Sequence, residues 1–358
     1  MIVKIIGAGS IGCHMAHAAR SLGWTVDLVD CSEEALSRAR NQTFPTRYGQ
    51  WDDSINLFLS GEAPMDHYDL IILGTPPDTH MQLALSAVKE KPKALLIEKP
   101  ACTIDLDGVD RLIQACTDFD VVGFVGYNHC VSDSVVALEG HLRNFQDQEL
   151  KSLDVHWREH WAGIFSAHPW LSGPFDSYLG FYARGGGAAC EHSHGINMWQ
   201  HFSRVCGGGR IKKVQATFAF DLEDLYDEQA YFLFETETGL IGSCIQDVVT
   251  HDVDKSIRLQ LAETRMGLKF GSEDSLFISG AAPPLEERFR KTRPDDFIAE
   301  LLHVEKCLTQ NLESPISLRN GLETMVVLAA CFESAETGRS VEVKYEPVLG
   351  VPALTQEN

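Results

Sequence analysis

The chain has 358 residues, which is too long for one average domain and suits two. Its 44% hydrophobic and 23% charged residues are ordinary for a globular protein, so a disordered, collagen-like or low-complexity chain is excluded. Lys and Arg number 30 against 51 Asp and Glu, and the formal charge of −21 disfavours nucleic acid and anionic membranes as partners.

Strands and helices alternate through the first third of the chain. Short apolar runs predict strands at residues 2–6, 25–29, 70–73, 94–97 and 121–125. Helical spacing predicts helices at residues 10–22, 78–88 and 107–116, with Asp78 as the cap of the second. Another helix is predicted to begin after Ser32, its N-cap. This rhythm predicts an α/β domain over residues 1–125, with a parallel sheet between two layers of helices.

The alternation ends near residue 126. A helix is predicted at 131–143, a strand at 153–157, a loop rich in glycine and aromatics over 161–187, and one helix at 189–202. Segments at 213–220, 230–235, 239–249, 257–262 and 267–270 predict an antiparallel meander. Helices at 295–309 and 318–336 end an α+β domain over 126–358, and they are candidates for packing back on the first domain. We expect the ligand between the two domains.

The first predicted helix follows a G-x-G-x-x-G fingerprint, Gly7-Ala8-Gly9-Ser10-Ile11-Gly12. Gly7 permits a tight turn, Gly9 lets the backbone approach a pyrophosphate, and Gly12 allows close packing of helix on strand. The helix start supplies free N–H groups for phosphate. Asp30 ends the second strand, where a carboxylate accepts hydrogen bonds from ribose hydroxyls and repels a 2′-phosphate. We therefore predict NAD, with NADP less favoured; a glycine-rich turn without a ligand is the alternative.

Three later motifs follow predicted strands: Gly74-Thr75-Pro76-Pro77-Asp78-Thr79-His80, Glu98-Lys99-Pro100 and Gly126-Tyr127-Asn128. Together with the fingerprint, the glycines at 185–187 and Ser193-His194, they resemble the Gfo/Idh/MocA family, the glucose–fructose oxidoreductase and inositol dehydrogenase relatives. The resemblance covers most of the chain. It implies a Rossmann domain followed by an open, mainly antiparallel sheet domain. It also implies hydride transfer between NAD(P) and a carbon of a sugar, cyclitol or sugar-derived compound.

Such a reaction needs a base for the hydroxyl proton and a donor for the developing oxyanion. The resemblance makes Lys99 the catalytic lysine, and His194 is the best base because imidazole titrates near working pH. Glu98 is expected to position its neighbours. The predicted cofactor-binding set is Gly7, Gly9, Ser10, Ile11, Gly12, Asp30, Thr75, Pro76, His80, Glu98, Lys99 and Asn128.

The acid that accompanies the histidine departs from the family's common D-x-x-x-H pattern. Cys190 stands four residues before His194, whereas Glu191 stands three before it. The segment looks like an S-H-x-x-[DN] variant that ends at Asn197. We expect Glu191 and His194 to share one helix face, with Glu191 as the third catalytic residue.

Aromatic residues in the 161–184 loop suit stacking on a sugar ring. Arg184 could hold a carboxylate or phosphate, so an acidic or nucleotide-linked sugar is one possible substrate. The predicted substrate-binding set is Lys99, Asn128, Trp161, Arg184, His194 and Asn197. No metal site is predicted. There are two candidate histidine groups, His192 with His194 and His201, and His156 with His160. Neither group has a Glu or Cys at the spacing of a zinc motif.

The ten cysteines are scattered without a C-x-x-C pair, which is typical of a reducing compartment. The N-terminus does not resemble a signal peptide, and no apolar run approaches the roughly 20 residues of a membrane span. We expect a cytoplasmic homodimer or homotetramer. Two other functions stay open: a non-catalytic NAD-binding regulator or accessory protein, and a glycosidase-like enzyme that uses NAD for transient oxidation.

Overall fold

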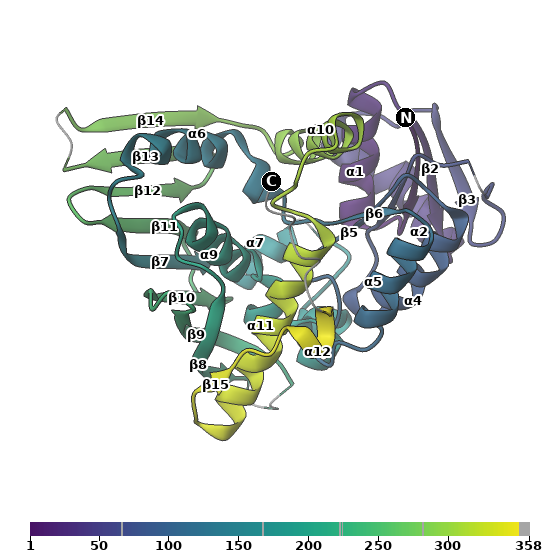
Figure 1. The fold of residues 1–358 in the computed structure, drawn as a ribbon. Coiled ribbons are helices and arrows are strands. Elements are labelled where there is room, and N and C mark those ends of the chain that lie inside the picture. Colours follow the sequence, from purple (N-terminus) through teal and green to yellow (C-terminus); the bar gives the residue numbers. More distant parts are fainter. Residues whose placement is uncertain (66, 167, 222, 224, 281–282, 351–358) are drawn as a thin grey trace.

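The computed structural model describes residues 1–350, apart from 66, 167, 222, 224, 281 and 282, and contains two β-sheets (Figure 1). The first sheet has six parallel strands in the order β3-β2-β1-β4-β5-β6. Their bounds are β1 Ile2–Ile6, β2 Thr25–Asp30, β3 Ile55–Leu59, β4 Leu70–Leu73, β5 Ala94–Ile97 and β6 Val122–Val125. Because all six run the same way, their carboxyl ends share one edge, where ligands bind in such sheets.

The helices of this domain are α1 Ser10–Ser21, α2 Glu33–Arg38, α3 Phe44–Tyr48, α4 Pro77–Ala87 and α5 Val109–Asp118. The predicted N-cap of α2 is confirmed, since the Ser32 side chain accepts a hydrogen bond from the backbone N–H of Ala35. The predicted cap of α4 is wrong. Pro76 occupies the cap position, and the Asp78 carboxylate instead pairs with Arg184. Strand β3 was not predicted, because it is a partly exposed edge strand with a weak apolar pattern.

The second sheet has nine strands in the order β14-β13-β12-β11-β7-β10-β9-β8-β15. Their bounds are β7 Leu150–Arg158, β8 Ile211–Phe220, β9 Asp227–Thr236, β10 Ile241–Asp247, β11 Asp254–Leu261, β12 Arg265–Phe270, β13 Glu273–Ser279, β14 Leu285–Arg290 and β15 Val341–Glu342. The predicted meander is interrupted: β7 lies between β10 and β11 and pairs in parallel with β10. Strands β13 and β14 were not predicted, since β14 carries charged residues in alternation.

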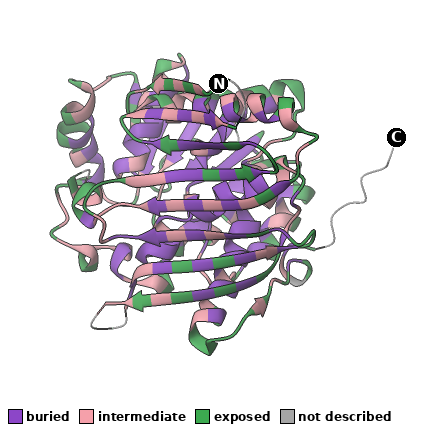
Figure 2. Ribbon diagram, turned by 90° about the vertical axis from the view of Figure 1, so that its left-hand side faces the viewer, coloured by how far each residue is buried: buried purple, intermediate pink, exposed green. Residues whose placement is uncertain are grey.

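Helices cover one face of this sheet. Helix α9, His194–Val205, contacts β7, and α11, Leu318–Thr337, contacts β8. Helix α6, Asp133–Leu142, contacts β12 and β13. Figure 2 views the opposite face, where no helix lies in front of the middle strands. Among the described residues, no helix is both long and apolar enough to cross a bilayer.

The single helix predicted over 189–202 is two helices, α8 Gly187–Glu191 and α9. At the break, the His192 carbonyl accepts a hydrogen bond from the Gln246 side chain of β10. The same carbonyl also accepts the Gly195 backbone N–H at 2.8 Å, a bond over three residues that marks the tight turn between the two helices. The long-range contact with Gln246 has no local signal in the sequence.

The last part of the chain returns to the first domain. Helix α10, Asp295–Gln310, packs on α1, and α11 packs against β6. The short α12, Glu346–Leu349, packs on α5. Most of the buried hydrophobic residues form one continuous core through both domains. A smaller cluster, separate from that core, consists of Trp161, Leu179, Ala188, Tyr226 and Val248.

Candidate active site

The fingerprint loop has the backbone geometry that its three glycines predict. Gly7 has φ +107°, and a Cβ added there would lie 2.7 Å from the Gly74 carbonyl oxygen. A Cβ on Gly12 would lie 1.8 Å from the Gly7 carbonyl oxygen, whereas a Cβ on Gly9 would meet nothing within 4 Å. Gly7 and Gly12 are therefore required by the protein itself. Gly9 leaves open space at the start of α1, where a phosphate would sit.

Two side chains from outside the fingerprint order it. The Asp30 carboxylate accepts hydrogen bonds from the backbone N–H groups of Ala8, at 2.8 Å, and Ser32, at 2.9 Å. Arg47, on α3, donates to the Ser10 hydroxyl at 2.7 Å and to the Ser10 carbonyl at 2.9 Å. Sequence analysis missed Arg47, since it lies 37 residues from Ser10 and no motif links them. It places a positive charge beside the N-terminus of α1.

The loops after β4 and β5 are joined by His80, which is fully buried. Its Nε2 lies 2.8 Å from the Thr75 carbonyl oxygen and its Nδ1 lies 3.1 Å from that of Pro100. His80 therefore holds the two motif loops together, and its contact with the cofactor stays a prediction. The Thr75 hydroxyl accepts a hydrogen bond from Thr79 at 2.8 Å, and this bond tightens the same turn.

Lys99 and Glu191 form an ion pair between the two domains. The Lys99 Nζ lies 2.9 Å from the Glu191 carboxylate and 2.8 Å from the Glu191 carbonyl oxygen. Both side chains are mostly buried. Burial alone would raise the pKa of Glu191, but the charges of Lys99 and His192 hold that pKa below its usual value. The Tyr178 hydroxyl lies 3.5 Å from the same carboxylate, a contact that sequence analysis did not assign.

His194 begins α9 and is half-buried among aromatic rings. Its ring centroid lies 5.6 Å from that of Tyr127, 4.8 Å from that of His129 and 5.7 Å from that of Trp157. Burial, followed by the charges of His129 and Lys99, lowers the pKa of His194 well below 6.5. The imidazole is therefore neutral at physiological pH and can accept a proton. The expectation that Glu191 and His194 share one helix is wrong, because the α8–α9 break separates them.

Several buried polar atoms at this junction lack a hydrogen-bond partner among the described residues. They are Glu98 Oε1, Asn128 Oδ1, His192 Nε2, Ser193 Oγ and both carboxyl oxygens of Glu300. Because buried polar groups are usually paired, such a set indicates a place for a polar ligand or water. Predicted residues Glu98 and Asn128 belong to this set.

Glu300 was missed by sequence analysis. It lies on the buried face of α10 with Phe297, Leu301 and Val304, and it is fully buried. An acid inside an apolar helical stripe is the signal that would have identified it. Burial raises the pKa of Glu98 to about 7, and burial together with the Glu98 charge raises the pKa of Glu300 well above 4.5.

Three predicted substrate residues are engaged elsewhere. The Asn197 amide donates to Thr324 at 3.0 Å and accepts from the Cys130 thiol, also at 3.0 Å, so it is part of the core. Trp161 is buried in the smaller hydrophobic cluster. Arg184 pairs with Asp78 at 2.6 Å, which links the long loop to the start of α4. All three side chains thus have partners within the protein, and their contact with a substrate stays a prediction.

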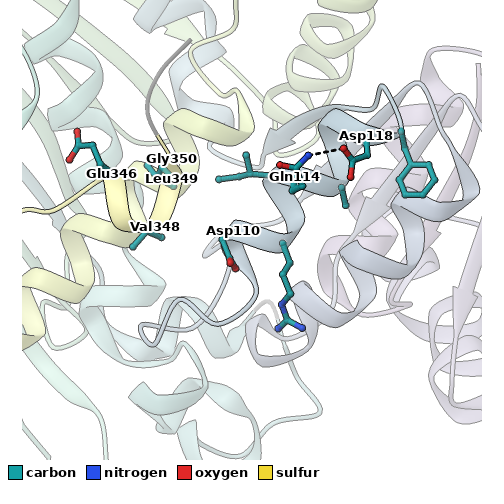
Figure 3. Close-up of a pocket in the computed structure, with 11 residues that line it drawn as sticks. Asp110, Gln114, Asp118, Glu346, Val348, Leu349 and Gly350 are labelled. Atoms are coloured by element: carbon teal, nitrogen blue, oxygen red, sulfur yellow. Dashed lines mark hydrogen bonds between the residues drawn. The ribbon is translucent and has the colours of Figure 1, made fainter. Parts of the chain in front are cut away.

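A surface pocket of 610 Å³ lies between α5 and α12 (Figure 3). Asp110, Gln114, Asp118 and Glu346 line it together with apolar residues. None of its lining residues belongs to the predicted site, so this pocket is separate from the candidate active site. Among the described residues, no group of three His, Cys, Asp or Glu side chains is arranged to hold a metal ion.

Comparison with protein families matches residues 1–127 to the model described as "Oxidoreductase family, NAD-binding Rossmann fold", the GFO_IDH_MocA family. This confirms the family resemblance seen in the motifs of the N-terminal domain. No curated protein sequence that was compared matches the chain.

Solved structures share the fold over nearly the whole chain. An oxidoreductase from Agrobacterium radiobacter, solved with NAD+, L-tartaric acid and magnesium, has a TM-score of 0.76 at 16% identity, over 96% of this chain and 98% of that one. A levoglucosan dehydrogenase in complex with NADH has a TM-score of 0.76 at 15% identity, over 96% and 99%. The WlbA dehydrogenase from Bordetella pertussis, solved with NADH and UDP-GlcNAcA, has a TM-score of 0.71 at 18% identity, over 96% and 98%. At these identities the likeness concerns the fold.

Proposed function

Because the N-terminal domain of this chain belongs to the Gfo/Idh/MocA oxidoreductases, with an NAD-binding Rossmann fold, we propose that the protein is an NAD-dependent dehydrogenase or reductase. It would transfer hydride between nicotinamide and a hydroxyl-bearing carbon of a sugar, cyclitol or sugar-derived compound. One observation carries the proposal. A Lys99–Glu191 ion pair lies just after the carboxyl end of β5, and the charge of Lys99 also acts on the neutral His194.

Bound NAD supplies the hydride chemistry, and the protein's residues handle the proton and the charge. In this proposal Lys99 donates a hydrogen bond to the substrate oxygen and stabilises negative charge on it. His194 accepts the hydroxyl proton in oxidation and returns it in reduction. Glu191 keeps the Lys99 ammonium in place. It acts through that contact and through the Tyr178 hydroxyl.

The adenosine end supports NAD over NADP. Asp30 lies at the end of β2, and its carboxylate already orders the fingerprint turn. A 2′-phosphate at this place would face that carboxylate, and the two negative charges would repel each other. Because Arg184 is taken by Asp78, the structure adds no support for an anionic substrate. An acidic or nucleotide-linked sugar stays a prediction from the sequence.

A direct test combines calorimetry with a turnover screen. We expect NAD to bind the purified protein, and absorbance at the nicotinamide band to change with at least one member of a panel of sugars, cyclitols and nucleotide sugars. Absence of NAD binding would refute the proposal. Binding without turnover would favour the regulator alternative, and turnover without net consumption of NAD would favour the glycosidase-like one.

The open face of the nine-stranded sheet supports the proposed homodimer or homotetramer. Tyr231, Leu233 and Ile241 are 42%, 48% and 55% exposed and lie on the neighbouring strands β9 and β10. Covering them with a second copy would bury apolar surface. Light scattering on the purified chain tests this.

All ten cysteines lie in the described part of the chain and are free thiols, which supports the proposed cytoplasmic location.

A further inference from the structure

Part of the loop between α7, Trp161–Ser166, and α8 contacts both the sheet domain and the Rossmann domain. We call residues 168–185 the strap. On the sheet-domain side, Tyr182 donates its backbone N–H to the Leu225 carbonyl at 2.9 Å, and its ring stacks on Phe332. The other side of the strap contacts the Rossmann domain at two separate places.

The first contact is at the end of α2. The Arg38 guanidinium lies over the Trp170 ring, 5.2 Å from its centroid. The second contact is at the start of α4, where Arg184 pairs with Asp78 at 2.6 Å. There Gly185 packs so closely on Pro77 that a Cβ would lie 2.7 Å from that ring.

These two contacts lie on opposite sides of the fingerprint. Helix α2 follows β2, helix α4 follows β4, and β1 with its glycine turn lies between them in the sheet. A dinucleotide in such a fold extends along the same line, from the adenosine side at β2, over the start of α1, to the nicotinamide side at β4. The strap therefore runs along the path of the cofactor.

Charges between the two contacts agree with this placement. His168 interacts electrostatically with Glu191 at the catalytic junction and with Arg47 at the fingerprint, and these charges act on its pKa in opposite directions. Arg47 holds Ser10 at the N-terminus of α1. A pyrophosphate at that helix start would thus lie near both His168 and Arg47.

Trp170 has no role in folding that the structure shows. It is half-exposed and belongs to neither hydrophobic cluster that the described residues form. Its ring contacts are His168, 5.4 Å between centroids, and Arg38. The Trp170–Arg38 pair therefore joins the strap to the cofactor domain without being part of either hydrophobic core.

We propose that the strap is the outer wall of the dinucleotide site and that Trp170 on Arg38 is the latch at its adenosine end. Arg184 on Asp78 fixes the other end beside the nicotinamide. The cofactor then leaves only when the latch opens, so Trp170 and Arg38 set the release rate of NADH. This inference rests on the proposed function, because it presumes that the fingerprint binds NAD.

The test is stopped-flow release of NADH from the full-length protein and from Trp170→Ala, Arg38→Ala and the double variant. Loss of a half-exposed cation–π contact predicts release about 2- to 5-fold faster in each single variant. The double variant should release no faster than either single one, since both remove the same latch. Arg40→Ala is the matched control. This neighbouring arginine pairs with Asp53 at the surface, and release from its variant should equal that of the wild type.

Release from Arg38→Ala within twofold of that from Arg40→Ala would overturn the latch, as would additive effects in the double variant. Faster association with unchanged release in Trp170→Ala would show that the strap blocks the site, and this too would refute the inference. Should Trp170→Ala fail to fold, Arg38→Ala and Trp170→Leu provide the same comparison. Wild-type protein that binds no NADH at all would instead refute the proposed function.

Discussion

Replacing Asp227 with asparagine should change how the stability of this protein depends on pH. Asp227 is fully buried at the start of β9, and one of its carboxyl oxygens accepts the Ala189 backbone N–H of α8 at 2.7 Å. The other oxygen has no partner among the described residues. Burial raises the pKa of this carboxyl from 3.8 to about 8. The protonated form is therefore favoured in the folded protein.

The sign and size of this pH dependence of stability follow from proton linkage. The folded state holds the Asp227 proton more tightly than the unfolded chain, so stability falls as pH rises from about 4 to about 8. A shift of about four pKa units corresponds to roughly 6 kcal/mol in total, of which roughly 4 kcal/mol is lost between pH 5 and pH 8. Asparagine cannot ionise. The Asp227→Asn substitution lowers stability by an amount that does not depend on pH, because its amide is unpaired. It also removes the fall in stability with pH that Asp227 causes.

The measurement is urea unfolding of the wild type and Asp227→Asn at half-unit steps from pH 5 to pH 8. We expect the stability of the variant relative to the wild type to improve steadily over that range. Glu228→Gln, at the partly exposed neighbouring position, is the control and should follow the wild-type curve. Parallel pH curves for the wild type and Asp227→Asn would refute the reasoning, because they would mean that the carboxyl does not titrate with folding.

The remaining predictions concern the cofactor and the catalytic pair. Gly9→Ala should keep its unfolding free energy but weaken NAD binding at least tenfold by calorimetry, since its Cβ meets only the place of the pyrophosphate; unchanged affinity would contradict this. Gly12→Ala should lose roughly 1–3 kcal/mol or more of stability in urea, because its Cβ overlaps a carbonyl oxygen. Lys99→Met should keep NADH binding within a few-fold and lower turnover about 100- to 10,000-fold, and full turnover would remove the lysine from the mechanism. Asp30→Ser should reduce the preference for NAD over NADP in paired titrations, and an unchanged ratio would show that another group sets it.

The Rossmann half of the fold was predictable because its signals are local. Apolar runs such as Leu70–Leu73 are buried throughout, and each is followed by a glycine or charged motif that marks the strand end. Local apolar patterns did not predict strands β3 and β14. Their residues alternate or carry charge because they form sheet edges, and a propensity pattern alone does not separate such strands from loops.

The site was predictable where it follows strand ends and not where it depends on distant contacts. Lys99 was placed by its motif, and its partner Glu191 lies 92 residues away. A break between α8 and α9 separates Glu191 from His194, so the prediction of one shared helix face failed. Asn197 has suitable spacing, but Thr324 of α11 takes its amide. Such competition between partners is decided only in three dimensions.

A segment near the end of the chain covers one edge of the N-terminal sheet. Strand β6 is an edge of the parallel sheet, and the segment before α11 pairs with it: the Val125 N–H bonds the Ile316 carbonyl at 2.9 Å, and Phe124 forms a bridge with Ser317. During synthesis, about 190 residues must be added after β6 before this cover exists. At roughly 5–20 residues per second that takes on the order of 10–40 s. Throughout that time the nascent Rossmann sheet has an open edge that a strand of another chain can join, and the segment before α11 closes this edge only when the chain is nearly complete.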